Sequence, residues 1–369
     1  MAQDAINVVE DFSYDSRNDA YNRSFREWRS NTRTGYAYRY ADNLRERSYV
    51  AGKAVTKPSA AHIERKTLSH VCEVIGAALL LYIICEIAGS SLLERLFQLL
   101  DLNVHLDFLN SSASGSQLAV AGVRILTLLL KYSIPIIVLL ACFRLPRKVI
   151  MPHNFRALPE SLLAIGCAMI GSAVYTLTAN AQGVEDAQTI FTYKDTAVIA
   201  GSVLADAIIG AILAELLLRG LMLPVLRQFG DLFAVCSTAA FAFFFPNTLP
   251  QRIGELLLGI AGGYIMLRGG SLWKCVMMRF LYTLLNLSRV ILIYTQHTLP
   301  RWQFIMILLL TGFGLLFFFM RVRRSKGLLL ANRRTQLSGG NKISAAMQSV
   351  TMLPWAALAL LMLLIQMFF

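Results

Sequence analysis

The chain has 369 residues, of which 56% are hydrophobic and 15% are charged. Soluble domains carry about a quarter charged residues, so this composition excludes a soluble enzyme, a nucleic-acid-binding domain and a disordered scaffold as descriptions of the whole chain. The formal net charge of +13 does not indicate nucleic-acid binding, because the basic residues gather at the ends of hydrophobic runs. The sequence therefore predicts a multi-pass membrane protein, with the lipid bilayer as its solvent and no nucleic acid as a partner.

Residues 1–66 form a polar segment that is rich in Arg, Asp, Asn, Ser and Tyr. Its aliphatic residues are too scattered to form a core, so a mostly disordered, basic and tyrosine-rich tail is predicted. Arginine and tyrosine alternate in TRTGYAYRYADNLRERSY, a pattern that is compatible with contacts to RNA or anionic lipid headgroups. We favour the simpler interpretation, which is a solvated cytoplasmic tail that helps to fix the topology.

Nine hydrophobic segments follow the tail, and a helix needs about 20 residues to cross the hydrocarbon core of a bilayer. The segments lie near 68–88, 121–143, 160–180, 197–226, 231–248, 252–268, 271–295, 303–321 and 350–369. The expected fold is an all-α integral membrane bundle of about nine transmembrane helices. We divide it into N-terminal transmembrane helices (67–194), a core (195–295) and C-terminal transmembrane helices (296–369).

The connecting loops alternate in charge along the chain. The tail is basic, the loop 89–120 carries three acidic residues with Arg95 as its one basic residue, and the next two loops are basic and acidic in turn. Because Lys and Arg collect in cytoplasmic loops, this alternation predicts a cell-membrane protein with a cytoplasmic N-terminus and a C-terminus on the outside.

Three ionisable residues lie within the fourth hydrophobic segment, where charge is costly and usually paired or functional. Glu215 and Arg219 are four residues apart with the acid first, which favours an ion pair on one helix face. The pair is either a structural contact or part of a site. Asp206 lies nine residues before Glu215, about half a helical circumference away. It therefore belongs to a second cluster, with Lys131 as its predicted partner.

Three stretches near these charges, AELLLRG, FAFFF and GIAGGYIMLRGGSLWKCVMMRFLYTLLN, resemble the CPBP family of CAAX prenyl proteases and bacteriocin-processing or immunity proteins. The resemblance covers about residues 195–290, and it implies an integral membrane protein. Family members carry the motifs E-E-x-x-x-R, F-x-x-x-H and H-x-x-x-N. The matching positions are Glu215, Arg219, Gly220, Phe241, Gly263, Tyr264, Gly270, Ser271, Leu272 and Trp273.

The resemblance also identifies four positions at which the chemistry of the family is replaced. The catalytic glutamate that activates water corresponds to Ala214, and the histidine of the second motif corresponds to Phe245. The histidine and the asparagine of the third motif correspond to Arg279 and Thr283. The resemblance thus implies an intramembrane endopeptidase family, with substitutions at the catalytic positions of this chain.

Three of the motif positions are expected at one depth in the membrane. Glu215, Phe245 and Arg279 each lie roughly 18 Å from the cytoplasmic end of their predicted helix at 1.5 Å per residue. Arg279 stays protonated, so it cannot act as a base, and it would repel a divalent cation. We expect its guanidinium to fill the space of a ligand or metal and to pair with Glu215, which leaves Arg219 to backbone carbonyls or a second acid. The alternative is that Arg279 extends toward the cytoplasm.

Smaller features complete the prediction for this region. Gly259, Gly262 and Gly263 form a small-residue face that lets helices approach closely. Thr283 and Asn286 share a helix face with Arg279, which indicates a wet or protein-facing surface. The six cysteines form no CxxC pair, so neither a disulfide framework nor a zinc site is expected, and no metal or other cofactor is predicted.

Three functions are compatible with these residues. The first is a proteolytically inactive CPBP-family protein that binds, escorts or protects another membrane protein or a lipidated peptide. The second is an active intramembrane peptidase with a rebuilt site, in which Glu215 is the base and Arg219 or Arg279 stabilises the oxyanion. The third is a transporter with a relay of Asp206, Lys131, Glu215 and Arg279. We favour the first, because a peptidase is not expected to keep its activity after four substitutions in one site.

Overall fold

Helices make up nearly all of the regular structure in the computed structural model of the chain. It describes residues 16–31, 35–37, 60–100, 104–107, 112–115, 117–154, 158–182, 200–201, 203–246, 248–296, 300–323 and 336–368. The helical segments are α1 (Asp19–Ser30), α2 (Ala60–Leu99), α3 (Gln117–Phe143), α4 (Arg147–Ile150), α5 (Leu158–Gln182), η2 (Val203–Gly210), α7 (Ala211–Glu215), η3 (Leu216–Met222), α8 (Leu223–Arg227), α9 (Asp231–Phe243), α10 (Leu249–Gly269), α11 (Leu272–Gln296), α12 (Pro300–Arg323), α13 (Gly339–Met347) and α14 (Met352–Phe368). Segments η2 and η3 are π-helical. Between α2 and α3 the strands β1 (Val104–Asp107) and β2 (Ser112–Gly115) form an antiparallel hairpin.

Five helices among the described residues are long and apolar enough to cross a membrane. They are Ala61–Leu99, Ala121–Phe143, Glu160–Asn180, Val203–Arg227 and Phe304–Arg321. A sixth span is counted if α13 and α14, which meet at a bend of 91°, form one broken span. The helical membrane fold is therefore confirmed. Each of the nine predicted segments coincides with a helical segment, but nine transmembrane helices are not confirmed, and the membrane orientation of the termini stays a prediction.

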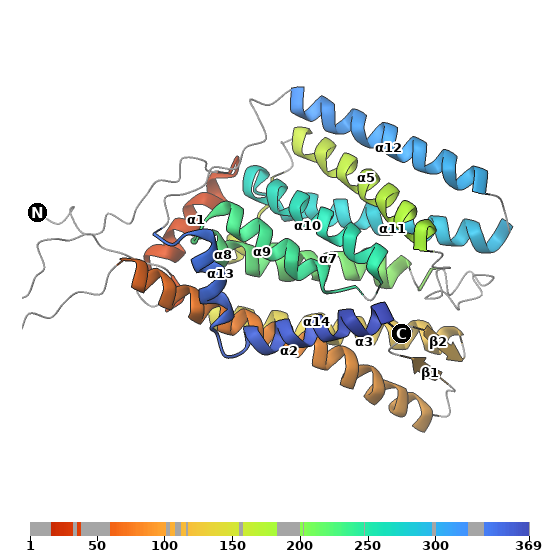
Figure 1. The fold of residues 1–369 in the computed structure, drawn as a ribbon, viewed down its shortest axis with the longest axis horizontal. Helices are drawn as coiled ribbons and strands as arrows, with labels where there is room; N and C mark the ends of the chain where they lie inside the picture. The colour runs from red at the N-terminus through yellow and green to blue at the C-terminus, as the bar shows by residue number, and fades with distance from the viewer. Residues whose placement is uncertain are drawn as a thin grey trace, which may run out of the picture.

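The helices of the predicted core lie in the middle of the bundle. In Figure 1, α5 and α12 lie along one side, α2 and α14 lie along the other, and α7, α9, α10 and α11 lie between them. Helix α5 packs against α10, α11 and α12, while α2 packs against α3, α13 and α14. This arrangement surrounds the core segments with other helices, so their side chains face protein on several sides.

Glycines bring α9 and α10 into close contact. A Cβ atom placed on Gly259 would lie 2.7 Å from the Cα atom of Ala239, and one placed on Gly263 would lie 3.0 Å from a methyl group of Val235. Gly262 faces the side chains of Arg219 and Met278 instead. The predicted small-residue face is present, and it serves both helix packing and the placement of a buried arginine.

Replacing Gly259 by alanine is expected to destabilise the protein by about 1–3 kcal/mol, because the added methyl group would overlap the backbone of α9. Gly312 in α12 is the matched control, since a Cβ atom there would meet nothing within 4 Å. The same substitution at Gly312 is expected to leave stability unchanged or to raise it slightly. The measurement is the midpoint of thermal unfolding in detergent, and equal midpoints for the two variants would contradict the prediction.

Helix α1 is an ordered segment of the N-terminal tail. Its N-cap is Asn18, whose side chain accepts a hydrogen bond from the backbone N–H of Tyr21. Tyr21, Phe25 and Trp28 are buried against the bundle, and Trp28 Nε1 donates to the backbone carbonyl of Phe143 at 2.9 Å. The spacing of these three aromatic residues places them on one face of a helix, which fixes α1 across the end of α3.

The prediction that residues 1–66 are mostly disordered does not hold for α1 or for residues 60–66, which begin α2. It rested on scattered aliphatic residues, whereas aromatic side chains supply the buried surface here. The guanidinium of Arg227 adds to this contact, since it lies 5.8 Å from the ring centre of Tyr21 and 5.5 Å from that of Phe25. Most of the arginine–tyrosine stretch, residues 32–49, lies outside the described residues.

Candidate functional site

Arg279 joins two carboxylates in the centre of the bundle. Its Nε lies 2.7 Å from Glu215 Oε1, and its Nη1 lies 2.6 Å from Glu255 Oε1. Glu215 ends α7, Glu255 lies in α10 and Arg279 lies in α11. The predicted ion pair between Arg279 and Glu215 is present, and the second carboxylate makes the arginine a bridge between three helical segments.

Arg219 completes this group, which we call the Arg279 cluster (Glu215, Arg219, Glu255 and Arg279). Its Nη1 lies 3.3 Å from Glu215 Oε1. Its Nη2 donates to the backbone carbonyls of Leu258 and Gly259 at 3.3 and 2.9 Å. Arg219 therefore binds backbone carbonyls of α10, as expected for an arginine that shares its acid with Arg279.

The Arg279 cluster is shielded from solvent and balanced in charge. Glu215 and Arg219 are fully buried, and the side chains of Arg279 and Glu255 are 7% and 11% exposed. Two arginines and two glutamates give no net charge when all four are ionised. Removing charges from water is costly, and the loss is offset only by close pairing and further hydrogen bonds. Each member of the cluster thus depends on the others to remain charged in this position.

Four polar atoms of the cluster have no hydrogen-bond partner among the described residues. They are Glu215 Oε2, Arg219 Nε, Glu255 Oε2 and Arg279 Nη2. A buried polar atom without a partner costs about 1–3 kcal/mol. The cluster therefore has hydrogen-bonding capacity that the described residues do not use.

The substituted motif positions bring no catalytic group to the cluster. Ala214 is buried directly before Glu215. Phe245 lies beyond the end of α9, which corrects the prediction that it belongs to the fifth helix, because α9 ends at Phe243. Its ring stacks on Tyr82 with centroids 4.5 Å apart and meets Tyr132 edge-on at 6.1 Å. Phe245 thus belongs to an aromatic group with residues of α2 and α3.

The polar face of α11 continues beyond Arg279 toward α5. Thr283 is half-buried one turn further along. Asn286 accepts a hydrogen bond from Ser172 Oγ at 2.7 Å, and α11 packs against α5. At Asn286 this face is therefore turned toward protein.

A partly buried ion pair lies beside Phe245 and its aromatic neighbours. Lys131 Nζ contacts Glu86 Oε1 at 2.8 Å and lies 5.3 and 5.8 Å from the ring centres of Tyr82 and Tyr132. The pairing of Lys131 with Asp206 stays a prediction, although η2 packs against α3. The estimate that Asp206 lies half a circumference from Glu215 assumed a regular α-helix, whereas η2 is π-helical. Glu86 is the partner that the sequence reasoning missed.

Glu255 is the other acid that the sequence reasoning missed. It is a carboxylate inside the apolar segment 252–268, and that was the available signal, because an acid within such a segment usually has a partner. Hydropathy alone does not tell which neighbouring helix supplies the partner. The structure shows that Arg279 of the following helix does so.

The residues of this site do not fit a divalent metal ion. Carboxylates or neutral imidazoles would have to bind it, and Ala214 and Phe245 have no such group. Glu215 and Glu255 already bind the guanidinium of Arg279, whose positive charge opposes a second cation. Among the residues that the structure describes, no group of three or more His, Cys, Asp or Glu side chains could hold a metal.

A comparison with protein families assigns this region. The family model described as type II CAAX prenyl endopeptidase Rce1-like matches residues 196–285. No curated protein and no solved structure matches the chain. The matched stretch contains the whole Arg279 cluster. Residues 196–285 are therefore similar to the Rce1-like CAAX prenyl endopeptidases of the CPBP family, as the resemblance in the sequence predicted.

Proposed function

We propose that this protein is a proteolytically inactive member of the CPBP type, which binds another membrane protein or a lipidated peptide and does not cleave it. The observation that carries the proposal is the position of Arg279. Its guanidinium lies between Glu215 and Glu255, at the place where the family motif has a histidine. The region that matches the family model contains these motif positions, but its charged groups bind one another.

Hydrolysis would need a base with a free lone pair next to a water molecule. Glu215 Oε1 already accepts hydrogen bonds from Arg279 and Arg219, which leaves Oε2 as the one oxygen of this carboxylate that could face a water molecule. Ala214, which corresponds to the catalytic glutamate of the family, carries no polar side-chain atom. Arg279 stays protonated and therefore cannot replace a histidine as a base. These three features support a loss of peptidase activity.

The unpartnered atoms of the Arg279 cluster support a binding role. Glu215 Oε2 and Glu255 Oε2 can accept hydrogen bonds, and Arg279 Nη2 and Arg219 Nε can donate them. A polar group inside a membrane gains from such contacts, because hydrocarbon offers none. A partner with one polar group in an otherwise apolar segment, such as a lipidated peptide or a transmembrane helix, fits this chemistry.

The proposal is tested with the purified full chain and a fluorogenic farnesylated CAAX peptide. The wild type is expected to cleave the peptide no faster than the Glu215→Gln variant does. A variant that carries Ala214→Glu, Phe245→His, Arg279→His and Thr283→Asn is assayed beside them, because it restores the family motifs. Cleavage by the wild type that disappears in Glu215→Gln would contradict the proposal and would favour the rebuilt peptidase.

Binding is measured separately with a photoreactive farnesylated peptide in the dark and after illumination. Labelling of the wild type that an unreactive farnesylated peptide displaces is the expected result. Gly262→Leu places a side chain beside Arg219 and is expected to reduce labelling, whereas Gly312→Leu on α12 is the control and is expected to leave it unchanged. Labelling that no competitor displaces would count against this class of partner.

A further inference from the structure

Three exposed basic side chains lie together in the short connection between α3 and α5. We call Arg144, Arg147 and Lys148 the basic connection. All three are exposed, whereas their neighbours Leu145 and Val149 are buried. Within the part of the chain that the structure describes, none of the three side chains forms a hydrogen bond or ion pair. The buried residues fix the backbone, and the charges extend away from it.

The basic connection lies at the end of a membrane span. The span Ala121–Phe143 ends directly before it, and the backbone carbonyl of Phe143 binds Trp28 of α1. Ile137 and Leu140 lie on α3 at positions that share a helix face and are 62% and 37% exposed. An acyl chain can therefore lie along this apolar face, with its headgroup at the level of Arg144.

The backbone of Arg144 has a φ of 47°. This left-handed conformation favours glycine, because a Cβ atom is crowded there. Arg144 directly follows α3, and its backbone N–H donates to the carbonyl of Leu140 at 3.1 Å, so this residue closes the helix in the left-handed cap conformation. Its side chain is exposed at the end of α3, within four residues of the other two charges.

Three other basic residues near this end of the bundle are neutralised within the protein. Arg17 and Arg321 both pair with Glu160, and Arg227 pairs with Asp231. Helix α1 packs against α4, so its acids could in principle neutralise the basic connection. However, α1 has two exposed acids and two exposed arginines, which are Asp19, Glu27, Arg23 and Arg26. Among the residues that the structure describes, the charges of the basic connection thus have no acidic partner.

We propose that the basic connection binds the phosphate of an anionic phospholipid in the leaflet that adjoins this end of the bundle. Guanidinium groups bind phosphate oxygens through two parallel hydrogen bonds, and the lysine adds a point charge. Each basic residue near an anionic membrane surface strengthens binding by about fivefold. The continuous apolar face of α3 favours a lipid over a soluble phosphate as the source of this group.

The test uses the full chain in detergent with short-chain phosphatidylglycerol and phosphatidylcholine as probes, and native mass spectrometry counts the bound lipids. The wild type is expected to prefer phosphatidylglycerol. The combined variant Arg144→Gln, Arg147→Gln and Lys148→Gln is expected to lose roughly a hundredfold of its affinity for that lipid. Its unfolding temperature is expected to stay unchanged, because the three side chains are exposed.

Two controls make the result specific. Arg144→Lys with Arg147→Lys keeps the charge and is expected to retain most of the preference, and Arg95→Gln on the exposed end of α2 is expected to change nothing. Equal binding of the two lipids by the wild type, or unchanged binding by the triple variant, would overturn the proposal. Inorganic phosphate that displaces phosphatidylglycerol at equal concentration would show a site for a soluble anion and would also overturn it.

Discussion

Replacing Arg279 by methionine is expected to lower the free energy of unfolding by about 3–5 kcal/mol, because the change leaves uncompensated charge in the centre of the bundle. Arg279 contacts Glu215 and Glu255 at 2.7 and 2.6 Å, and these acids are buried. Methionine fills a similar volume without a charge, so packing changes little while both carboxylates lose their closest cation. The midpoint of unfolding in mixed micelles with increasing dodecyl sulfate measures the effect.

A second variant separates lost charge from lost packing. Arg279→Met combined with Glu215→Gln and Glu255→Gln removes the uncompensated acids and is expected to recover much of the lost stability, since neutral replacement of a buried ion pair is often tolerated. Arg95→Met at an exposed position is the matched control and is expected to change little. A wild-type midpoint for Arg279→Met alone would show that the cluster does not hold the helices together.

This expectation gives the substituted site a physical role. The Arg279 cluster joins α7, η3, α10 and α11 through ion pairs and two backbone carbonyls. In a peptidase, these positions would have to keep a base and a water molecule free to react. Here the same positions hold charged groups that pair with one another, which favours a stable scaffold over turnover.

The sequence predicted those parts of the fold and site that depend on local pattern. Each of the nine segments predicted from hydrophobic length coincides with helical structure. The ion pair of Arg279 with Glu215 followed from depth, because an arginine in the membrane must find an acid or a carbonyl. The same rule predicted backbone carbonyls or a second acid for Arg219, which binds carbonyls of α10 and also keeps its contact with Glu215. In each case the cost of an unpaired buried charge restricted the possible answers.

The parts that the sequence did not predict depend on how helices are rotated against each other. Glu255 and Glu86 find their partners on other helices, and hydropathy does not specify which faces meet. The π-helical turns around Glu215 change the rotation of side chains along the span. Helix α1 was missed because three aromatic residues can dock a polar segment that lacks aliphatic residues.

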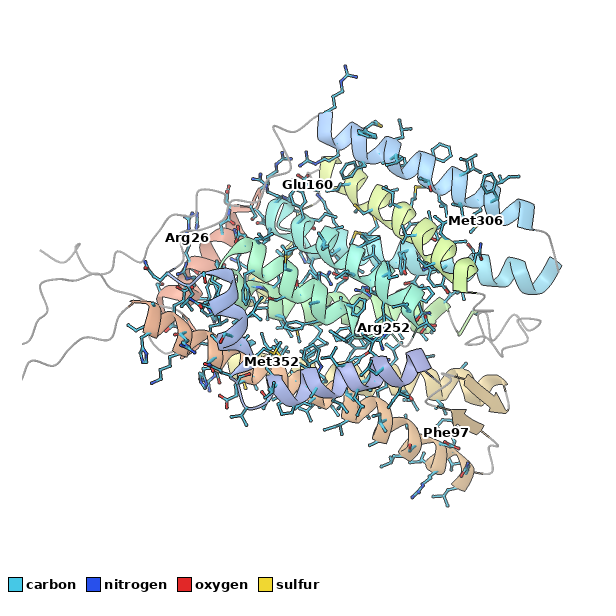
Figure 2. All side chains as sticks on the ribbon, viewed as in Figure 1. Arg26, Phe97, Glu160, Arg252, Met306 and Met352 are labelled. Carbon is cyan, nitrogen blue, oxygen red and sulfur yellow. The ribbon has the colours of Figure 1, made fainter. Side chains whose placement is uncertain are left out.

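Glu160 is the second position at which a single change is expected to have a large effect. Its fully buried carboxylate contacts Arg17 at 3.1 Å and the buried Arg321 at 3.3 Å. In Figure 2, Glu160 and Arg26 of α1 both lie further to the left than Arg252. Glu160→Gln is expected to lower the free energy of unfolding by about 3–5 kcal/mol, because Arg321 is left buried without its acid. The ion pair with Arg17 contributes less, because Arg17 is half-exposed.

The loss of Glu160 should also loosen the N-terminal segment, since Arg17 binds this acid and its backbone N–H donates to the carbonyl of Arg268. Trypsin is therefore expected to cleave the Glu160→Gln variant within residues 17–29 faster than the wild type, at a temperature where both remain folded. Glu27→Gln on the exposed face of α1 is the matched control and should be cleaved at the wild-type rate. Faster cleavage together with a lower unfolding midpoint would show that one buried carboxylate holds both α12 and the N-terminal segment on α5. A lower midpoint with unchanged cleavage would restrict its role to the contact with Arg321.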